Sequence, residues 1–172
     1  MINIYKTNIK LNSITQDVKN ELIKEYWFKS FQEVRKKGMF NFVLSAKYVD
    51  IEYDLIKLLL NTYTKINTLD LNLVKTSKCF AYISTKDSYD SYIHNHKDVH
   101  SITAVYYAYV PKCKGGELEF YDNNNNLINS IKPKTNDFVI FDGSLNHKPL
   151  PSNSNEYRIS LSTGLEIYNQ RQ

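Results

Sequence analysis

The stretch HKDVHSITAVYYAYVPKCKGGEL, from His96 to Leu118, decides the expected fold. Its middle part, residues 102–110, is rich in β-branched and aromatic side chains, which favour strands. Residues 111–116 then supply proline and glycine, which favour tight turns, and a second short β-rich run follows at 117–121. The stretch therefore predicts two consecutive strands joined by a short turn.

The same alternation of short strands and turns extends through the second half of the chain. We expect strands at residues 79–85, 91–98, 102–110, 117–121, 127–131, 137–141, 147–150 and 157–163. Segments rich in Gly, Pro, Asn or Ser separate several of them, at 111–116, 122–126, 133–136 and 151–155. Many short, regularly punctuated strands are typical of a double-sheet jelly roll.

The first part of the chain has a helical pattern instead. Leu22, Ile23, Tyr26 and Trp27 recur at helical spacing within an expected helix at 15–37, and a second helix is expected at 51–66 with Asp50 as its N-cap. The expected fold is therefore mainly β (α+β), a double-stranded β-helix (jelly roll) with N-terminal helices packed on one sheet. We expect a single domain over residues 1–172, with a helical support region at 1–77 and the jelly-roll core at 78–167.

Composition excludes several classes of protein. A chain of 172 residues with 42% hydrophobic and 23% charged residues is typical of a globular domain, and no apolar run is long enough for a membrane span. The N-terminus shows no secretory signal, and Cys79 and Cys113 are expected to be free thiols in a cytoplasmic protein. The net charge of +4 is small and scattered, so neither a nucleic-acid partner nor a membrane partner is expected.

Two histidines and an aspartate suggest a metal site. On a regular strand, His96 and Asp98 would point to the same face, and His147 from a distant strand could complete the site. Two imidazoles and a carboxylate form the facial triad of non-haem iron enzymes. The alternative set is His94, His96 and His147, three histidines that suit zinc as well as iron. His100 is expected near the mouth of the site.

Arg158 is the candidate anion-binding residue. In the expected strand at 157–163, Ile159 and Leu161 would occupy one face, and Arg158 and Ser160 the other, polar face inside the barrel. An arginine that points inward requires a partner, and a carboxylate bound by both arms of its fork is the best one.

From about residue 78 to 167 the chain resembles the 2-oxoglutarate- and Fe(II)-dependent dioxygenases, particularly the prolyl 4-hydroxylase-like branch. The resemblance rests on the H-x-D at His96 and Asp98, the tyrosine-bearing strand at 102–107, the G-G-E-L at 115–118, the run at 133–141 before His147, and the R-x-S at Arg158 and Ser160. It implies Fe(II) bound by His96, Asp98 and His147. It also implies that Arg158, Ser160 and Tyr107 hold 2-oxoglutarate, with Tyr106 or Tyr82 as substitutes for the tyrosine.

The activity implied by this resemblance is hydroxylation of an unactivated C–H, with O2 and 2-oxoglutarate as co-substrates and ascorbate as a supporting reductant. The substrate would be a peptide or protein, for example at a prolyl residue, or else a free amino acid or another small molecule. A non-catalytic, cupin-like metal-binding protein is the alternative from another functional class. The polar pair Arg158 and Ser160 argues against it, because a simple cupin has no reason to place them there.

Overall fold

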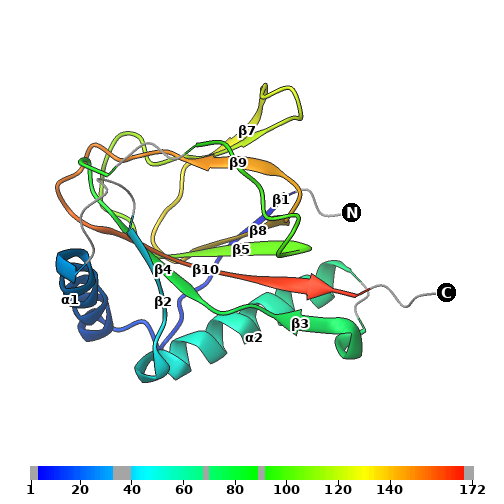
Figure 1. The fold of residues 1–172 in the computed structure, drawn as a ribbon, viewed down its shortest axis with the longest axis horizontal. Helices are drawn as coiled ribbons and strands as arrows, with labels where there is room; N and C mark the ends of the chain where they lie inside the picture. The colour runs from blue at the N-terminus through cyan, green and yellow to red at the C-terminus, as the bar shows by residue number, and fades with distance from the viewer. Residues whose placement is uncertain (1–3, 33–39, 68–69, 89–91, 169–172) are drawn as a thin grey trace.

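Two facing β-sheets and two helices make up the computed structural model, which describes residues 4–32, 40–67, 70–88 and 92–168. The small sheet lies above the large one in Figure 1, and both helices lie below the large sheet. The order of layers is therefore small sheet, large sheet, helices. The expected jelly roll with helices packed on one sheet is confirmed.

The large sheet is antiparallel throughout and has the order β1-β8-β5-β10-β4-β2, with β3 also paired to β10. The small sheet has the order β7-β6-β9. The large-sheet strands are β1 (Ile4–Asn8), β2 (Phe40–Val43), β3 (Val74–Thr76), β4 (Phe80–Ser84), β5 (Ile102–Tyr109), β8 (Asp137–Asp142) and β10 (Arg158–Ile167). The small-sheet strands are β6 (Leu118–Tyr121), β7 (Leu127–Ile131) and β9 (Asn146–Pro149).

The large sheet buries apolar side chains on both of its faces. On the helix side, alternate residues of β5 and β10 join one core, which includes Ala104, Tyr106 and Leu161. On the other side, alternate residues of β5 and β8 meet the small sheet in a second core made of Tyr107, Leu118, Phe120, Val139 and Phe141. Successive strand residues point to opposite faces. The second core therefore marks the interior between the two sheets.

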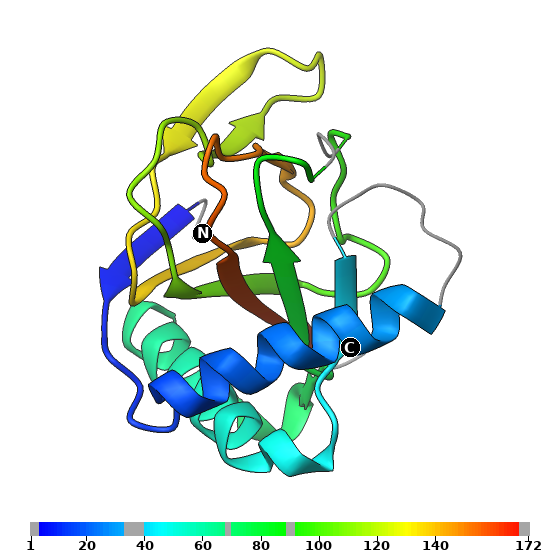
Figure 2. The same ribbon diagram turned by 90° about the vertical axis from the view of Figure 1, so that its left-hand side faces the viewer.

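The helices cover the outer face of the large sheet, as Figure 2 shows from the side. They are α1 (Gln16–Gln32) and α2 (Val49–Ile66), and short 3-10 turns, η1 (Ala46–Tyr48) and η2 (Leu71–Leu73), flank α2. Leu22 of α1 and Leu55 and Leu59 of α2 are fully buried against the sheet. The amphipathic pattern that predicted these helices thus corresponds to a real buried stripe, although Trp27 remains 41% exposed.

The helix boundaries differ in detail from the sequence-based expectation. Thr15 caps α1 through its hydroxyl, which accepts a bond from Val18 N at 3.2 Å, and residues 33–37 of the expected helix lie outside the described chain. The prediction that Asp50 caps α2 is wrong. The 3-10 turn η1 runs directly into α2, so the N-cap is Tyr48 and Asp50 lies in the first turn. There the negative charge of Asp50 still interacts favourably with the helix dipole.

The region expected to be purely helical also supplies three strands, β1, β2 and β3. The strands β1 and β2 form the two edges of the large sheet. Both cysteines are free thiols, as expected. No helix in the described part of the chain combines the length and the apolar character that crossing a bilayer would require.

Asp137 ties the edge strand β1 to β8. Its carboxylate is 2% exposed and accepts bonds from Asn8 Nδ2 at 2.8 Å, Lys134 N at 2.7 Å and Lys6 Nζ at 2.7 Å. Burial alone would raise the pKa of Asp137, but the bonds from Asn8, Lys6 and Lys134 hold it below its usual range. The carboxylate is thus a buried anion that the protein itself satisfies completely.

We expect Asp137→Ala to lower the free energy of unfolding by about 2 kcal/mol, because it leaves several donors without a charged acceptor. Urea denaturation measures this, with Asp122→Ala as control. Asp122 also accepts three bonds, but in an exposed hairpin turn, so its loss should be clearly smaller. Equal losses would contradict the importance of burial. Because the folded-state pKa of Asp137 is lowered, its contribution is present above about pH 4 and disappears as the pH falls through the folded pKa.

Candidate functional site

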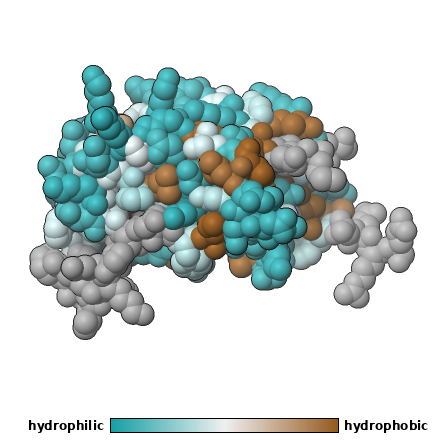
Figure 3. Space-filling view, turned by 90° about the horizontal axis from the view of Figure 1, so that it is seen from above, coloured by the Kyte–Doolittle hydropathy of each residue, from teal (hydrophilic) through white to brown (hydrophobic). Residues whose placement is uncertain are grey.

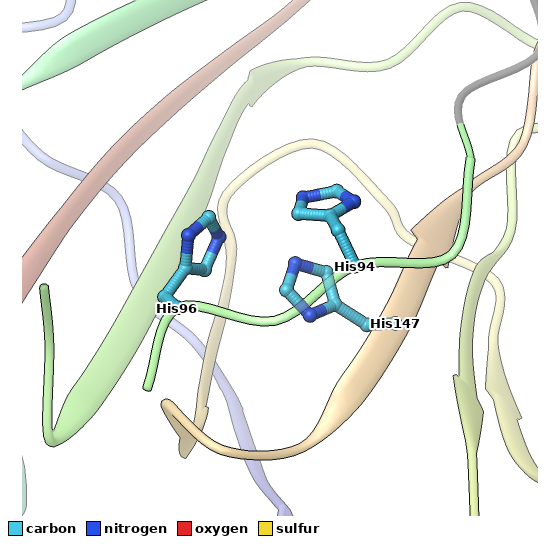
Figure 4. A group of neighbouring side chains, drawn as sticks. All are labelled: His94, His96 and His147. Atoms are coloured by element: carbon cyan, nitrogen blue, oxygen red, sulfur yellow. The ribbon is translucent and has the colours of Figure 1, made fainter. Parts of the chain in front are cut away.

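Three histidines from two distant segments converge in the interior between the sheets. The candidate ligand atoms of His94, His96 and His147 all lie within 4.8 Å of one another. Their rings are close together, with centroids 4.4 Å apart for His94 and His147 and 4.9 Å apart for His96 and His147. Figure 4 shows His147 rising from β9 toward the pair carried by the facing segment.

Backbone hydrogen bonds explain this convergence. His94 and His147 form an isolated antiparallel bridge, in which His94 N donates to His147 O at 3.0 Å and His147 N donates to His94 O at 2.8 Å. His96 N donates to Gly143 O at 2.7 Å, in the turn that leads into β9. The segment that carries His94 and His96 is therefore fixed along the start of β9.

The tautomers of two rings are also fixed. His147 Nδ1 lies 3.0 Å from Leu145 O, and His94 Nδ1 lies 3.0 Å from Tyr92 O. A carbonyl oxygen only accepts, so each Nδ1 carries a proton, and Nε2 is the nitrogen of each ring that is left for a metal. This is the usual arrangement behind a metal-bound histidine.

The charge state of the cluster suits a metal. Burial, opposed by the bond to Leu145 O and helped by repulsion from His94 and His96, lowers the pKa of His147 to about 3. Burial, followed by repulsion from His94 and His100, lowers the pKa of His96 to about 4. Both imidazoles are therefore neutral at neutral pH, and the neutral form is the one that binds metal.

Asp98 lies outside this cluster. It is exposed, in a turn where both Val99 N and His100 N donate to His96 O, at 2.9 and 2.8 Å. The strand expected at 91–98 is not formed there: among its described residues, only His94 makes a bridge. Asp98 would share a face with His96 only on a regular strand. The assignment of Asp98 as a ligand stays a prediction, and the geometry favours the alternative set with His94.

Arg158 is the second notable feature of the interior. It is only 3% exposed, although it is a full positive charge. Its Nε donates to Ser84 Oγ at 3.2 Å, and its Nη1 donates to Gly116 O at 3.0 Å and to Leu150 O at 3.1 Å. Within the described residues, no carboxylate pairs with it. A buried cation held only by neutral groups is ready to bind an anion.

The absence of a side chain at Gly116 makes room for this arginine. A Cβ built on Gly116 would lie 3.2 Å from Arg158 Nη1, and the residue has a φ of +80°. The G-G-E-L turn therefore contributes to the arginine pocket as well as to the hairpin. The sequence alone does not reveal this contact, because Gly116 and Arg158 are far apart along the chain and leave no local signal.

Ser160 and Tyr107 lie on the same inner face as Arg158. They are direct partners across β10 and β5, and Tyr82 is the partner of Ser160 on the other side. Burial raises the pKa of Tyr107 to about 12, while the positive charge of Arg158 acts in the opposite direction. Tyr106 points to the helix side instead, where its hydroxyl contacts Leu11 and Asn136. Of the tyrosines considered, Tyr107 and Tyr82 thus remain near the arginine.

Comparisons with known proteins identify the family and the fold. Residues 80–163 match the family model of the 2OG-Fe(II) oxygenase superfamily. This part of the chain belongs to the 2OG-Fe(II) oxygenase superfamily. The expected superfamily, the enzyme class of 2-oxoglutarate-dependent dioxygenases and the cofactors Fe(II), 2-oxoglutarate and O2 are thereby confirmed. No curated protein sequence matches the oxygenase at a significant level.

Solved structures share the fold of the oxygenase at low sequence identity. A prolyl hydroxylase from Trichoplax adhaerens, in complex with a peptide fragment of the hypoxia inducible factor oxygen degradation domain, has a TM-score of 0.67 and 16% identity over 94% of this chain and 82% of that one. A prolyl-4-hydroxylase from Pseudomonas putida has a TM-score of 0.65 and 17% identity over 98% and 94%. A non-heme alpha ketoglutarate dependent epimerase from nogalamycin biosynthesis has a TM-score of 0.66 and 11% identity over 97% and 79%.

The two candidate ligand sets can be separated by substitution. We expect His94→Ala, His96→Ala and His147→Ala each to weaken Fe(II) or Co(II) binding by more than the ~10–100-fold typical of outer-shell changes, because each removes a nitrogen donor. Asp98→Ala should bind metal like the wild type. Metal titration followed by elemental analysis measures this. Metal loss in Asp98→Ala together with retention in His94→Ala would return the site to the His96, Asp98 and His147 set.

Proposed function

We propose that this oxygenase hydroxylates a C–H bond of a peptide or protein, with iron held by His94, His96 and His147 and 2-oxoglutarate held by Arg158. The observation that carries the proposal is Arg158, a cation only 3% exposed that has no carboxylate partner within the described residues. It faces the same interior as the histidine cluster. A dicarboxylate with one end at the metal and the other at the arginine would satisfy both.

The donor set fits Fe(II). Three neutral imidazole nitrogens can occupy three positions of an octahedral metal and leave the others open for co-substrates, and imidazole suits iron among other metals. The bonds from His94 Nδ1 and His147 Nδ1 to backbone carbonyls hold those two rings in place. Orientation before metal binding lowers the free energy needed to assemble the site.

Arg158, Ser160 and Tyr107 would hold the far carboxylate of 2-oxoglutarate. Arg158 can offer its fork, while Ser160 and the buried phenol of Tyr107 lie beside it as hydroxyl donors. Because the pKa of Tyr107 is raised to about 12, its phenol keeps its proton and can donate to a carboxylate. The position of Tyr82 opposite Ser160 makes it the nearest substitute.

Buried apolar side chains line the interior beside His147. Phe120, Val139 and Phe141 are all completely buried, and the Phe141 ring lies 4.7 Å from the His147 ring. When bound, iron and 2-oxoglutarate supply the oxidising chemistry, in which the substrate C–H, O2 and 2-oxoglutarate give a hydroxylated substrate, succinate and CO2. The chain itself orients these groups and excludes water from them.

The substrate class is supported by the neighbours and by the surface. Two of the similar structures are named as prolyl hydroxylases, one of them in complex with a peptide. The surface above the small sheet is mainly hydrophilic but carries some hydrophobic side chains (Figure 3). Tyr92 and Val99, which flank the segment with His94 and His96, are 78% and 62% exposed and could contact a peptide. A free amino acid or a small metabolite is the alternative substrate.

One observation favours a second candidate function, metal binding without turnover. A set of three histidines is also a common zinc site, and zinc does not perform this redox chemistry. A metal-binding protein without a co-substrate, however, would gain nothing from an unpaired Arg158 in its interior. The choice between the two functions therefore depends on whether 2-oxoglutarate binds and is consumed.

We expect Arg158→Ala to weaken 2-oxoglutarate binding by ~2–4 kcal/mol, because the carboxylate would lose its charged partner. Titration of the visible absorption band of the Fe(II)–2-oxoglutarate complex under anaerobic conditions measures this. Arg158→Lys is the matched variant: it keeps the charge but loses the fork, so its affinity should be intermediate. Unchanged affinity in Arg158→Ala would place the co-substrate elsewhere.

Turnover separates the enzyme from the metal-binding protein. With Fe(II), 2-oxoglutarate, ascorbate and O2, we expect slow succinate release without substrate, and faster release when the right substrate is added. Peptides that contain proline are the first panel, and single amino acids are the second. His147→Ala is the control, because it removes a metal ligand. If wild type and His147→Ala release the same background of succinate with every compound, the oxygenase activity is refuted for this chain.

A further inference from the structure

Two buried polar atoms beside the histidine cluster have no hydrogen-bond partner within the described residues: Thr103 Oγ1 and His100 Nδ1. Thr103 is only 1% exposed, so water at the protein surface cannot satisfy its hydroxyl. Such a group costs about 1–3 kcal/mol of stability unless something bonds to it. The position of Thr103 in the sheet indicates which kind of partner its hydroxyl could have.

Thr103 belongs to a row of three residues across the large sheet. It is the direct partner of Gly164 in β10 and of Phe141 in β8. Side chains of directly opposed residues point to the same face, about 5 Å apart. Phe141 belongs to the core between the two sheets, so the hydroxyl of Thr103 also faces that interior.

A ring lies at each of the other two positions in this row, and each ring is close to a histidine of the cluster. At one end, a Cβ built on Gly164 would lie 2.5 Å from His100 Cγ and 2.6 Å from His100 Nδ1, so the imidazole of His100 rests on the bare glycine backbone. At the other end, the Phe141 ring lies 4.7 Å from the His147 ring. The His96 ring lies between the other two histidines, with its centroid 5.7 Å from that of His100 and 4.9 Å from that of His147. Thr103 therefore lies in the floor beneath these rings.

We infer that the Thr103 hydroxyl and His100 form a polar floor of the metal site and hydrogen-bond to an oxygen atom of a metal ligand. The oxygen would belong to a water molecule bound to the metal or to the keto acid, since either one has an oxygen atom that can accept a hydrogen bond. This inference rests on the proposed function, because it requires a metal at the histidine cluster. The two residues are positioning residues: they orient a ligand and do not bind the metal. Gly164 is required because any side chain there would displace His100.

Thr103→Val tests the inference with two independent readouts. Valine has the same shape without the hydroxyl, so the metal-free variant should melt at the same temperature as the wild type or about 3 °C higher, because an unsatisfied group is gone. With Co(II) bound, its visible absorption spectrum should differ from that of the wild type. Thr103→Ser retains the hydroxyl and should keep the wild-type spectrum.

Two arms identify the source of the oxygen. A spectral change with Co(II) alone indicates a bound water, whereas a change that appears only after 2-oxoglutarate is added, with affinity reduced about threefold to tenfold, indicates the keto acid. His100→Phe, which keeps a ring over Gly164 but removes its nitrogens, should give the same kind of change. The spectra thus distinguish the two ligands without any need for the substrate.

Three results would count against the inference. A metal-free Thr103→Val protein that melts well below the wild type would mean that the hydroxyl has a structural partner in the fold. A Thr103→Val spectrum identical to the wild type, with and without 2-oxoglutarate, would overturn the polar floor alone. If the wild-type protein binds no Co(II), the proposed metal site is refuted, and the polar floor with it. This result is obtained before any variant is compared.

Discussion

Strand β10 is hydrogen-bonded on both edges, to β5 and to β4, and this double pairing fixes which face each of its residues takes. Ile159 and Leu161 point to the helices, and Arg158 and Ser160 point to the space between the sheets. A slip of one residue would exchange the two sets and place a charge in the apolar core. The register therefore specifies the fold and the chemistry of the interior together, and the anion pocket is a consequence of the same alternation that buries the core.

How much the sequence could predict depended on whether the information was local. The strands near 102–110, 117–121 and 137–141 were predicted because their β-branched and aromatic residues lie between clear turn signals. The inward face of Arg158 followed from simple alternation. The path of the chain around His96 could not be predicted, because it depends on residues that are distant in sequence. His96 N donates to Gly143 O and Ser101 N donates to Leu165 O, and between these two bonds the chain turns at residues 97–99. The edge strands β1 and β2 were missed for a similar reason: they depend on pairing with β8 and β4 more than on their own composition.

Several buried polar groups are satisfied within the fold. Asp137 is satisfied by three protein donors, and the hydroxyl of Tyr106 both accepts from Leu11 N and donates to Asn136. Such groups fix one strand or loop against another. Arg158 and Thr103 differ, because within the described chain the first has no carboxylate and the second has no partner at all. Other buried polar atoms of the described chain also lack a partner, among them Ser13 Oγ and Ser152 Oγ, so it is the position of Arg158 and Thr103 on the inner face between the sheets that sets these two apart. Both are positions at which, in the proposed function, a ligand would complete the interior.

The identity of the ligand set has an electrostatic consequence. Three neutral imidazoles would leave a divalent metal with its whole charge of about +2, and Arg158 adds a further positive charge to the same interior. A dianionic keto acid would then neutralise most of this charge. If Asp98 were a ligand, part of the charge would be neutralised before the co-substrate arrived. A site built from three histidines would thus depend more strongly on its anionic co-substrate, since an unbalanced charge is costly inside a protein. In a three-histidine site, the exposed position of Asp98 and the lack of a carboxylate at Arg158 within the described residues would be two aspects of one arrangement, in which the negative charge comes with the ligand.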